Sequence, residues 1–169
     1  SEMCIRDSLN TLGREYLPLG GPYEVVPHTE LLNSLVADGK ITAVKPVART
    51  VTYHDPCYLG RHNDVITPPR ELIGDTGASL SEMPRHGKQS FCCGAGGARM
   101  WMEEKIGTAV NKTRADEAIA TGAQTVAVAC PFCSVMMSDA VAAKQQDGGA
   151  EGVEVTDVAR LMLQSVKSD

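Results

Sequence analysis

Short apolar runs alternate along the chain with segments whose apolar residues recur at helical spacing. This alternation predicts an α/β fold in which a mostly parallel sheet is flanked by helices. The clearest strand is Thr125–Cys130 (TVAVAC), because it is short, apolar and rich in valine. A second is Arg49–Pro56 (RTVTYHDP), where Val51 and Tyr53 alternate with polar residues before a proline. Briefer strands are predicted at 23–28 (YEVVPH), 79–84 (SLSEMP), 89–94 (QSFCCG) and 153–155 (VEV).

The segments between the strands have the spacing of helices. Proline in the first turn marks the start of one of them, and Thr156 is expected to cap the last. The longest helix is expected to run from about Ala98 to Thr121, with a break near Gly107. The predicted helices are 29–40, 68–77, 98–121, 134–146 and 156–166.

Cysteines stand where three of the predicted strands end. Cys57 follows the strand that ends at Pro56, Cys92 and Cys93 lie in QSFCCG, and Cys130 ends TVAVAC. In an open α/β sheet, ligands bind at the carboxyl ends of the strands. We therefore expect these thiols, together with Cys133 of the CPFC sequence, to converge at one edge of the sheet.

Composition and charge exclude several classes of function. The 169 residues are 43% apolar and 22% charged, which is typical of one soluble globular domain. A net charge of −5 without a cluster of lysines and arginines argues against binding to nucleic acid or to an anionic membrane surface. No run approaches the roughly 18 apolar residues of a membrane span. We expect a cytoplasmic protein that reaches the inner face of the membrane only through partners.

The first nine residues (SEMCIRDSL) do not blend into the rest of the chain and resemble read-through of a sequencing adapter. They are set aside as foreign, and Cys4 with them. Residues 10–169 are then predicted to form a single domain.

Several kinds of chemistry would use the five remaining cysteines. Buried cysteines can simply be small hydrophobic residues, but such residues have no reason to collect at one edge of a sheet. The CPFC sequence fits a thioredoxin-like redox pair, which would leave Cys57, Cys92 and Cys93 without a role. A tetrahedral zinc site uses four ligands and would leave a fifth thiol over. Zinc remains the alternative cofactor. The chain would then be a non-catalytic interaction domain that zinc stabilises.

An iron–sulfur cluster accounts for all five thiols. It is held by thiolates, and it is bulky enough for the adjacent Cys92 and Cys93 to reach different irons. Gly94 and Gly96 let the backbone approach sulfide without a Cβ clash. Their amide groups and the positive end of the following helix would favour an anionic cluster. The alternative, a dinucleotide-binding loop, fits poorly because Arg99 stands where the motif requires glycine or alanine.

Polar residues near the cysteines are further candidates. His54, Asp55, Arg61 and His62 flank Cys57, and Arg99 ends the glycine-rich loop. A histidine or arginine there could give a proton to a reduced sulfur or orient an anionic substrate. We assign catalytic roles to Arg99 and His62. The alternative for each is a solvated loop residue, a cap or a surface salt bridge.

The order Cys57, Cys92-Cys93-Gly94, Cys130-Pro131-Phe132-Cys133 resembles the cysteine-rich CCG domain. That domain occurs in heterodisulfide reductase and in the iron–sulfur subunits of glycolate oxidase and glycerol-3-phosphate dehydrogenase. The resemblance extends to HDPCYLGRHN, FCCGAGGARMW and ACPFC. It implies a parallel α/β unit that ligates one [4Fe–4S] cluster, cubane or non-cubane. By position, the resemblance implies the ligands Cys57, Cys92, Cys93, Cys130 and Cys133.

The resemblance also implies a setting for the chain. Such domains are usually duplicated, so the chain is expected to be the C-terminal half of a longer protein with a second CCG domain upstream. The protein would be an oxidoreductase component that transfers electrons and reduces a disulfide, as heterodisulfide reductase does. Its expected partners are a ferredoxin-like iron–sulfur domain and a flavoprotein subunit. The fragment by itself is not expected to be active.

Overall fold

A four-stranded, all-parallel sheet forms the centre of the molecule. The computed structural model describes residues 24–166. The sequence-based statements on residues 1–9, Cys4 included, lie outside that range. The strands are β1 (Thr50–Tyr53), β2 (Ser79–Leu80), β3 (Thr125–Val128) and β4 (Glu154–Asp157), in the spatial order β2-β1-β3-β4. The predicted α/β class with a parallel sheet is confirmed.

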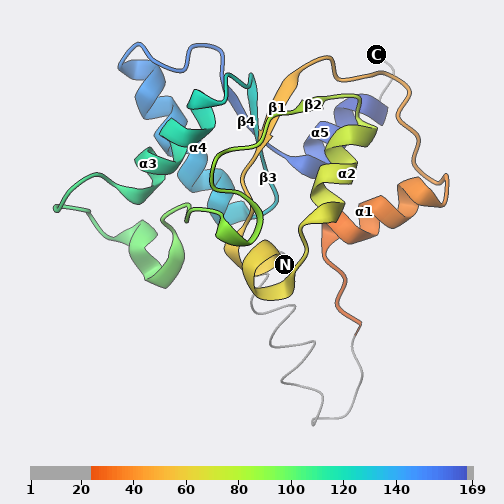
Figure 1. Cartoon of the computed structure of the whole chain (residues 1–169), viewed down its shortest axis with the longest axis horizontal. Helices are drawn as coiled ribbons and strands as arrows, with labels where there is room; N and C mark the ends of the chain where they lie inside the picture. Colours follow the sequence, from red (N-terminus) through yellow and green to blue (C-terminus); the bar gives the residue numbers. More distant parts are fainter. Residues whose placement is uncertain (1–23, 167–169) are drawn as a thin grey trace, which may run out of the picture.

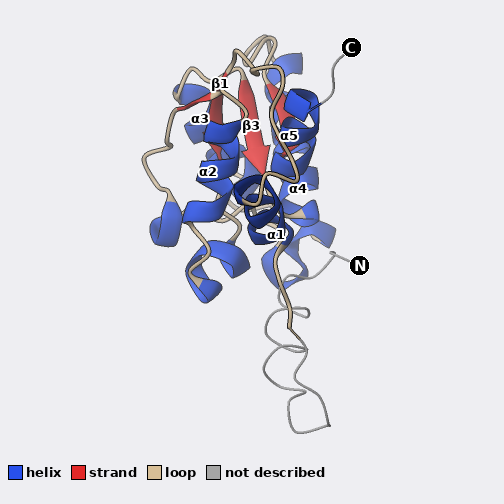
Figure 2. Cartoon of the chain, turned by 90° about the vertical axis from the view of Figure 1, so that its right-hand side faces the viewer, coloured by secondary structure: helices blue, strands red, loops and turns tan. Residues whose placement is uncertain are grey.

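Helices cover both faces of this sheet (Figures 1 and 2). Helices α1 (His28–Ala37), α2 (Thr67–Asp75) and α5 (Val158–Val166) pack against one another on one side, and α3 (Val110–Ala120) packs with α4 (Pro131–Gln146) on the other. Short helical turns occupy Cys57–Arg61, Gly87–Gln89 and Gly96–Trp101. None of the helices between residues 24 and 166 is long and apolar enough to cross a membrane.

The sequence of strand β3 is continuously apolar because both faces of the strand are buried. All four of its residues are buried, and they alternate between two cores. Val126 and Val128 belong to the core under α3 and α4, whereas Ala127 belongs to the core under α2 and α5. A strand that is covered on both faces has no polar side.

The strand order reverses between β1 and β3. From β1 the chain moves outward to β2, then returns to place β3 on the other side of β1 and β4 beyond it. Crevices at the carboxyl ends of strands form where the order reverses in this way. The chain segments that follow β1 and β3 therefore border the natural ligand site of the fold.

Two predicted strands are not strands in the structure. Of the segment 23–28, the described residues 24–27 are irregular and α1 begins at His28. Val26 is 46% exposed, so the short apolar run has no sheet to join. The segment 89–94 continues the turn Gly87–Gln89 into a loop. Cys92 and Cys93 thus reach the sheet edge on a loop, not at the end of a strand.

The long helix predicted for Ala98–Thr121 is also wrong over its first half. Positive φ values at Ala98 and Gly107 interrupt it, and helix α3 begins only at Val110. The cap of α5 differs as well, because Thr156 lies within β4. Asp157 takes the capping role, since its carboxylate accepts the amide N–H of Ala159 at 2.8 Å.

Candidate metal centre

All five cysteines of the described chain line one cavity of about 290 Å³. They are Cys57, Cys92, Cys93, Cys130 and Cys133, and none of them forms a disulfide. Much of the remaining wall is apolar, with Phe132, Met100 and Trp101 among its residues. The structure therefore brings together every thiol that the sequence order placed at this edge.

The two central strands position three of these thiols. Pro56 and Cys57 follow β1, and the chain turns directly into the helical turn Cys57–Arg61. Cys130 follows β3 and is the N-cap of α4. Pro131 suits the first turn of α4 because its missing N–H would have no partner there. Cys133 lies within the same first turn and is buried.

Gly94 brings the Cys92–Cys93 loop against α3. Its φ of +92° is one that other residues rarely adopt, and a Cβ there would lie 3.2 Å from the backbone nitrogen of Asn111. The same Cβ would lie 3.3 Å from Val110 and from Met136. The Gly94 amide also donates to the Cys92 sulfur at 3.3 Å. Glycine is needed here for close approach to α3, and the approach to sulfide expected from the sequence stays a prediction.

The thiols share protons and differ in acidity. The pKa of Cys130 is lowered to about 7 by a hydrogen bond from Cys133 and by the amide groups of Cys133 and Phe132, against the effect of burial. Hydrogen bonds from Cys133 and Cys92 lower the pKa of Cys93 far below its usual value. Burial raises the pKa of Cys57. Cys93 and Cys130 are therefore the thiols most easily held as thiolates, the form that binds metal.

A buried ion pair fixes the segment that leads to Cys57. Asp55 accepts two hydrogen bonds from Arg70, at 2.8 and 3.0 Å, and one from the amide of Gly87 at 2.8 Å. Arg70 also pairs with Glu82. The end of β1 is thereby tied to α2 and to the turn that precedes Cys92. Asp55 acts in the structure as an anchor and not as a solvated loop residue.

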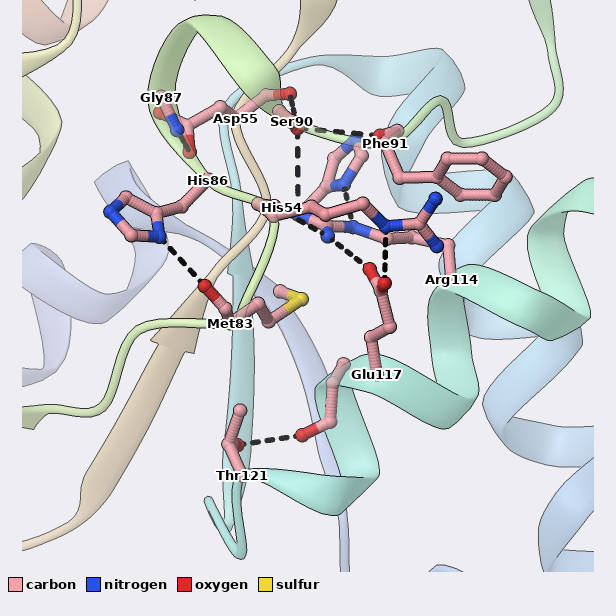
Figure 3. A network of polar contacts seen from close by, with 12 residues as sticks. His54, Asp55, Met83, His86, Gly87, Ser90, Phe91, Arg114, Glu117 and Thr121 are labelled. Carbon is pink, nitrogen blue, oxygen red and sulfur yellow. Dashed lines mark hydrogen bonds and ion pairs between the residues drawn. The ribbon is translucent and has the colours of Figure 1, made fainter.

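A second polar network joins His54 to α3 (Figure 3). His54 is 1% exposed and Arg114 is fully buried, and the Arg114 Nε donates to His54 Nδ1 at 2.9 Å. Arg114 also donates to Glu117 at 2.7 Å and to the carbonyl of Arg85 at 2.8 Å. A hydrogen bond between the His54 and Cys93 side chains helps to lower the pKa of Cys93, and their ligand atoms lie within 4.8 Å of each other. Burial lowers the pKa of His54, with a smaller contribution from Arg114.

The number of thiols and the size of the cavity fit a group larger than one ion. Within residues 24–166, the one compact set of three possible ligand atoms comes from His54, Cys93 and Cys133, which lie within 4.8 Å of one another. A tetrahedral zinc ion needs four ligands at about 2.0–2.3 Å. The other thiols are spread around a cavity far larger than the roughly 10–15 Å³ that one water needs. Five free cysteine thiols around such a space suit an iron–sulfur cluster.

The two residues given catalytic roles from the sequence lie at the periphery. Arg99 is exposed and forms an ion pair with Glu104 at 3.0 Å. His62 is exposed and stacks on Tyr58, with ring centroids 4.6 Å apart. Tyr58 lines the cavity, but neither Arg99 nor His62 is among its lining residues. Arg61 instead donates to the carbonyls of Lys88 and Ser90, which holds the segment before Cys92 in place.

Arg114 is a site residue that sequence reasoning missed. It lies 60 residues from its partner His54, in a helix whose pattern looks ordinary. The one available signal was a charged residue on the face of α3 that also carries Ala115 and Ala118, both of which are buried. His54 stands out in the sequence only as a neighbour of Cys57.

Comparison with known proteins identifies relatives of this chain. The profile of the CCG cysteine-rich domain family matches residues 51–138. A probable iron–sulfur-binding oxidoreductase, FadF, of Bacillus subtilis is 41% identical over 158 residues, which are 93% of this chain and 22% of that protein. The EtfAB:quinone oxidoreductase of Syntrophomonas wolfei is 39% identical over 163 residues, 92% of this chain and 22% of that protein.

A third relative comes from an archaeon. One of the subunits of the dihydromethanophenazine:CoB–CoM heterodisulfide reductase of Methanosarcina barkeri is 35% identical over 146 residues. The match covers 86% of this chain and 34% of that relative. The chain thus spans 22–34% of the length of these three relatives.

Proposed function

Because the chain belongs to the CCG cysteine-rich domain family, we propose that it is the iron–sulfur-binding part of an oxidoreductase subunit and that it transfers electrons. The observation that carries this proposal is the convergence of five free thiols on one cavity. The names of the relatives, which include an iron–sulfur-binding oxidoreductase and a heterodisulfide reductase, support the same chemistry.

The proposed ligands are Cys57, Cys92, Cys93, Cys130 and Cys133, and the proposed group is one [4Fe–4S] cluster. Such a cluster, when bound, stores and releases one electron at a time at a potential set by its surroundings. Five thiolates exceed the four that a cubane cluster requires. The fifth donor favours a non-cubane form, or a thiolate that exchanges with a substrate sulfur.

Backbone amides supply positive polarity around the cavity, whose described lining residues include no lysine or arginine. The amide of Gly94 points at Cys92, that of Ala95 at Cys93, and those of Phe132 and Cys133 at Cys130. The N-terminus of α4 adds the positive end of a helix dipole. These groups favour thiolates and an added electron, and the apolar wall residues limit the access of water.

The relatives include a subunit of a multi-subunit enzyme, which supports partner subunits for this site. We propose that a ferredoxin-like iron–sulfur domain or a flavoprotein subunit exchanges electrons with it. A second CCG domain would precede it in a longer protein, and the complex would work in the cytoplasm or at the inner face of the membrane. Reduction of a disulfide to two thiols, which takes two electrons and two protons, is the proposed reaction of the whole enzyme.

One observation favours a different function. The compact group of His54, Cys93 and Cys133 resembles part of a zinc site, which would make the domain structural. Zinc has no redox chemistry, so a redox experiment separates the two functions.

The test is reversible reduction of the protein after reconstitution with iron and sulfide in the absence of oxygen. Dithionite should bleach the visible absorption, and a one-electron oxidant should restore it. Serine substitutions made one at a time should remove most of the iron at four or more of the five cysteines, whereas Cys4→Ser is the matched control and should leave the spectrum unchanged. A colourless protein, or an absorption that dithionite does not change, would contradict electron transfer at this site.

A further inference from the structure

His54 is a buried imidazole held between a guanidinium and a thiol. It directly follows β1, and its backbone amide donates to the carbonyl of Ala127 in β3 at 2.9 Å. The backbone at His54 is thus fixed between the two central strands. One ring nitrogen faces Arg114, and the ligand atoms of His54 and Cys93 lie within 4.8 Å of each other. His54 is not among the residues that line the cavity, so it reaches the site only through the sulfur.

Arg114 determines which ring nitrogen carries the proton. A guanidinium has only donors, and its Nε lies 2.9 Å from His54 Nδ1. Nδ1 must therefore offer its lone pair, and the proton of the neutral ring is on Nε2. An imidazolium would place two N–H groups against each other at this contact.

Arg114 has no freedom to give up this contact. Its NH1 group donates to Glu117 at 2.7 Å and to the Arg85 carbonyl at 2.8 Å, and its NH2 group lies 3.4 Å from Ser90 Oγ. Figure 3 shows Arg114 enclosed by His54, Ser90 and Glu117. The Glu117 carboxylate offsets the buried charge. The tautomer of His54 is consequently built into the fold.

We propose that His54 donates an Nε2–H hydrogen bond to the Cys93 sulfur, raises the reduction potential of the bound cluster and is not a metal ligand. Arg114 is the positioning residue that fixes this tautomer. The inference rests on the proposed function, because it concerns a cluster held by Cys93. An N–H donor to a cysteine sulfur stabilises negative charge there, and the reduced cluster carries one more negative charge than the oxidised cluster. Reduction is favoured accordingly.

The same geometry rules out the other use of His54. His54, Cys93 and Cys133 lie close enough together to suggest three ligands of one ion. A ligating imidazole must offer a lone pair to the metal, but Nδ1 is committed to Arg114 and Nε2 carries the proton. His54 is therefore a donor to a ligand.

The experiment compares the reconstituted wild-type chain with His54→Phe and His54→Gln. Phenylalanine keeps a ring but has no N–H, whereas the amide of glutamine can donate from the place of Nε2. We expect all three proteins to bind equal iron and sulfide. The midpoint potential of His54→Phe should fall by the equivalent of at least a tenfold change in the reduction equilibrium, about 59 mV for one electron, and that of His54→Gln should stay near the wild-type value.

The outcomes separate this inference from the proposed function. A wild-type chain that binds no iron defeats the proposed function. A His54→Phe protein with a full cluster and an unchanged potential overturns the role of His54, as does loss of iron from both variants. If His54→Phe does not fold, the role of His54 is tested instead by electron paramagnetic resonance of reduced wild-type protein that carries 15N-labelled histidine. A weak magnetic coupling of a histidine nitrogen to the electron spin of the reduced cluster, together with coupling of an exchangeable proton, supports His54 as a hydrogen-bond donor. A strong nitrogen coupling, as direct ligation would give, or no coupling at all overturns that role.

Discussion

The buried carboxylate of Asp55 is held by both terminal nitrogens of Arg70, at 2.8 and 3.0 Å. The Asp55 side chain is 1% exposed and that of Arg70 is 17% exposed. Asp55 stands two residues before Cys57, and its carboxylate also accepts the amide N–H of Gly87. One carboxylate therefore connects two of the segments that carry the thiols.

Removal of this carboxylate should destabilise the protein strongly. Asp55→Ala leaves the largely buried Arg70 guanidinium with Glu82 alone and removes the acceptor of the Gly87 amide, and we expect a loss of about 3 kcal/mol in the free energy of unfolding. The matched control is Glu154→Ala, which breaks the Arg49–Glu154 pair, also at 2.8 Å but about half exposed on both sides. That change should cost less than about 1 kcal/mol. Urea unfolding measures both, and equal losses would contradict the anchoring role.

The two glycines assigned to the cofactor site should respond differently to alanine. Gly94→Ala combines a φ of +92° with a contact of 3.2 Å to the Asn111 backbone, and it should cost roughly 1–3 kcal/mol and reduce cluster loading. Gly96 has no atom within 4 Å of its added Cβ, so Gly96→Ala should behave like the wild type. Thermal unfolding and iron content report the difference. Similar behaviour of the two variants would show that close packing at Gly94 is unimportant.

Cys130 should be the accessible thiol that reacts first in metal-free protein. Its pKa is lowered to about 7, so the thiolate fraction, and with it the rate of alkylation by iodoacetamide, should rise with pH to a midpoint near 7. Cys57 is also partly accessible, but its pKa is raised by burial, and it should react only at more alkaline pH.

Peptide mapping assigns the two phases of that reaction. Cys130→Ser should abolish the phase near pH 7, and Cys57→Ser should leave it intact. A metal-free thiol oxidoreductase would use this same thiolate, and its activity would survive chelation. If no thiol titrates below its ordinary pKa, the hydrogen bonds around Cys130 are not as the structure has them.

Local patterns in the sequence predict a large part of the fold. Strand β3 is continuously apolar because both of its faces are covered, and β1 is recognisable because Val51 and Tyr53 alternate before a proline stop. Parallel strands with helical connections place their carboxyl ends together. The meeting of Cys57 and Cys130 could therefore be predicted from local patterns alone.

Other features depend on tertiary contacts that no pattern records. The QSFCCG segment has the composition of a strand, but Arg61 binds the carbonyls of Lys88 and Ser90 and holds it as a loop. The contact between Arg114 and His54 joins positions 60 residues apart. Charged residues in helices are usually solvated, so a buried arginine cannot be recognised without its partners.

Metal analysis is the decisive test of an iron–sulfur cluster in the cysteine cavity. It measures iron, acid-labile sulfide and zinc per chain, on protein purified or reconstituted without oxygen. We predict about four irons and four sulfides per chain, as a [4Fe–4S] cluster requires, and no zinc. One zinc without sulfide would contradict the cluster and would make the cysteine cavity a structural metal site.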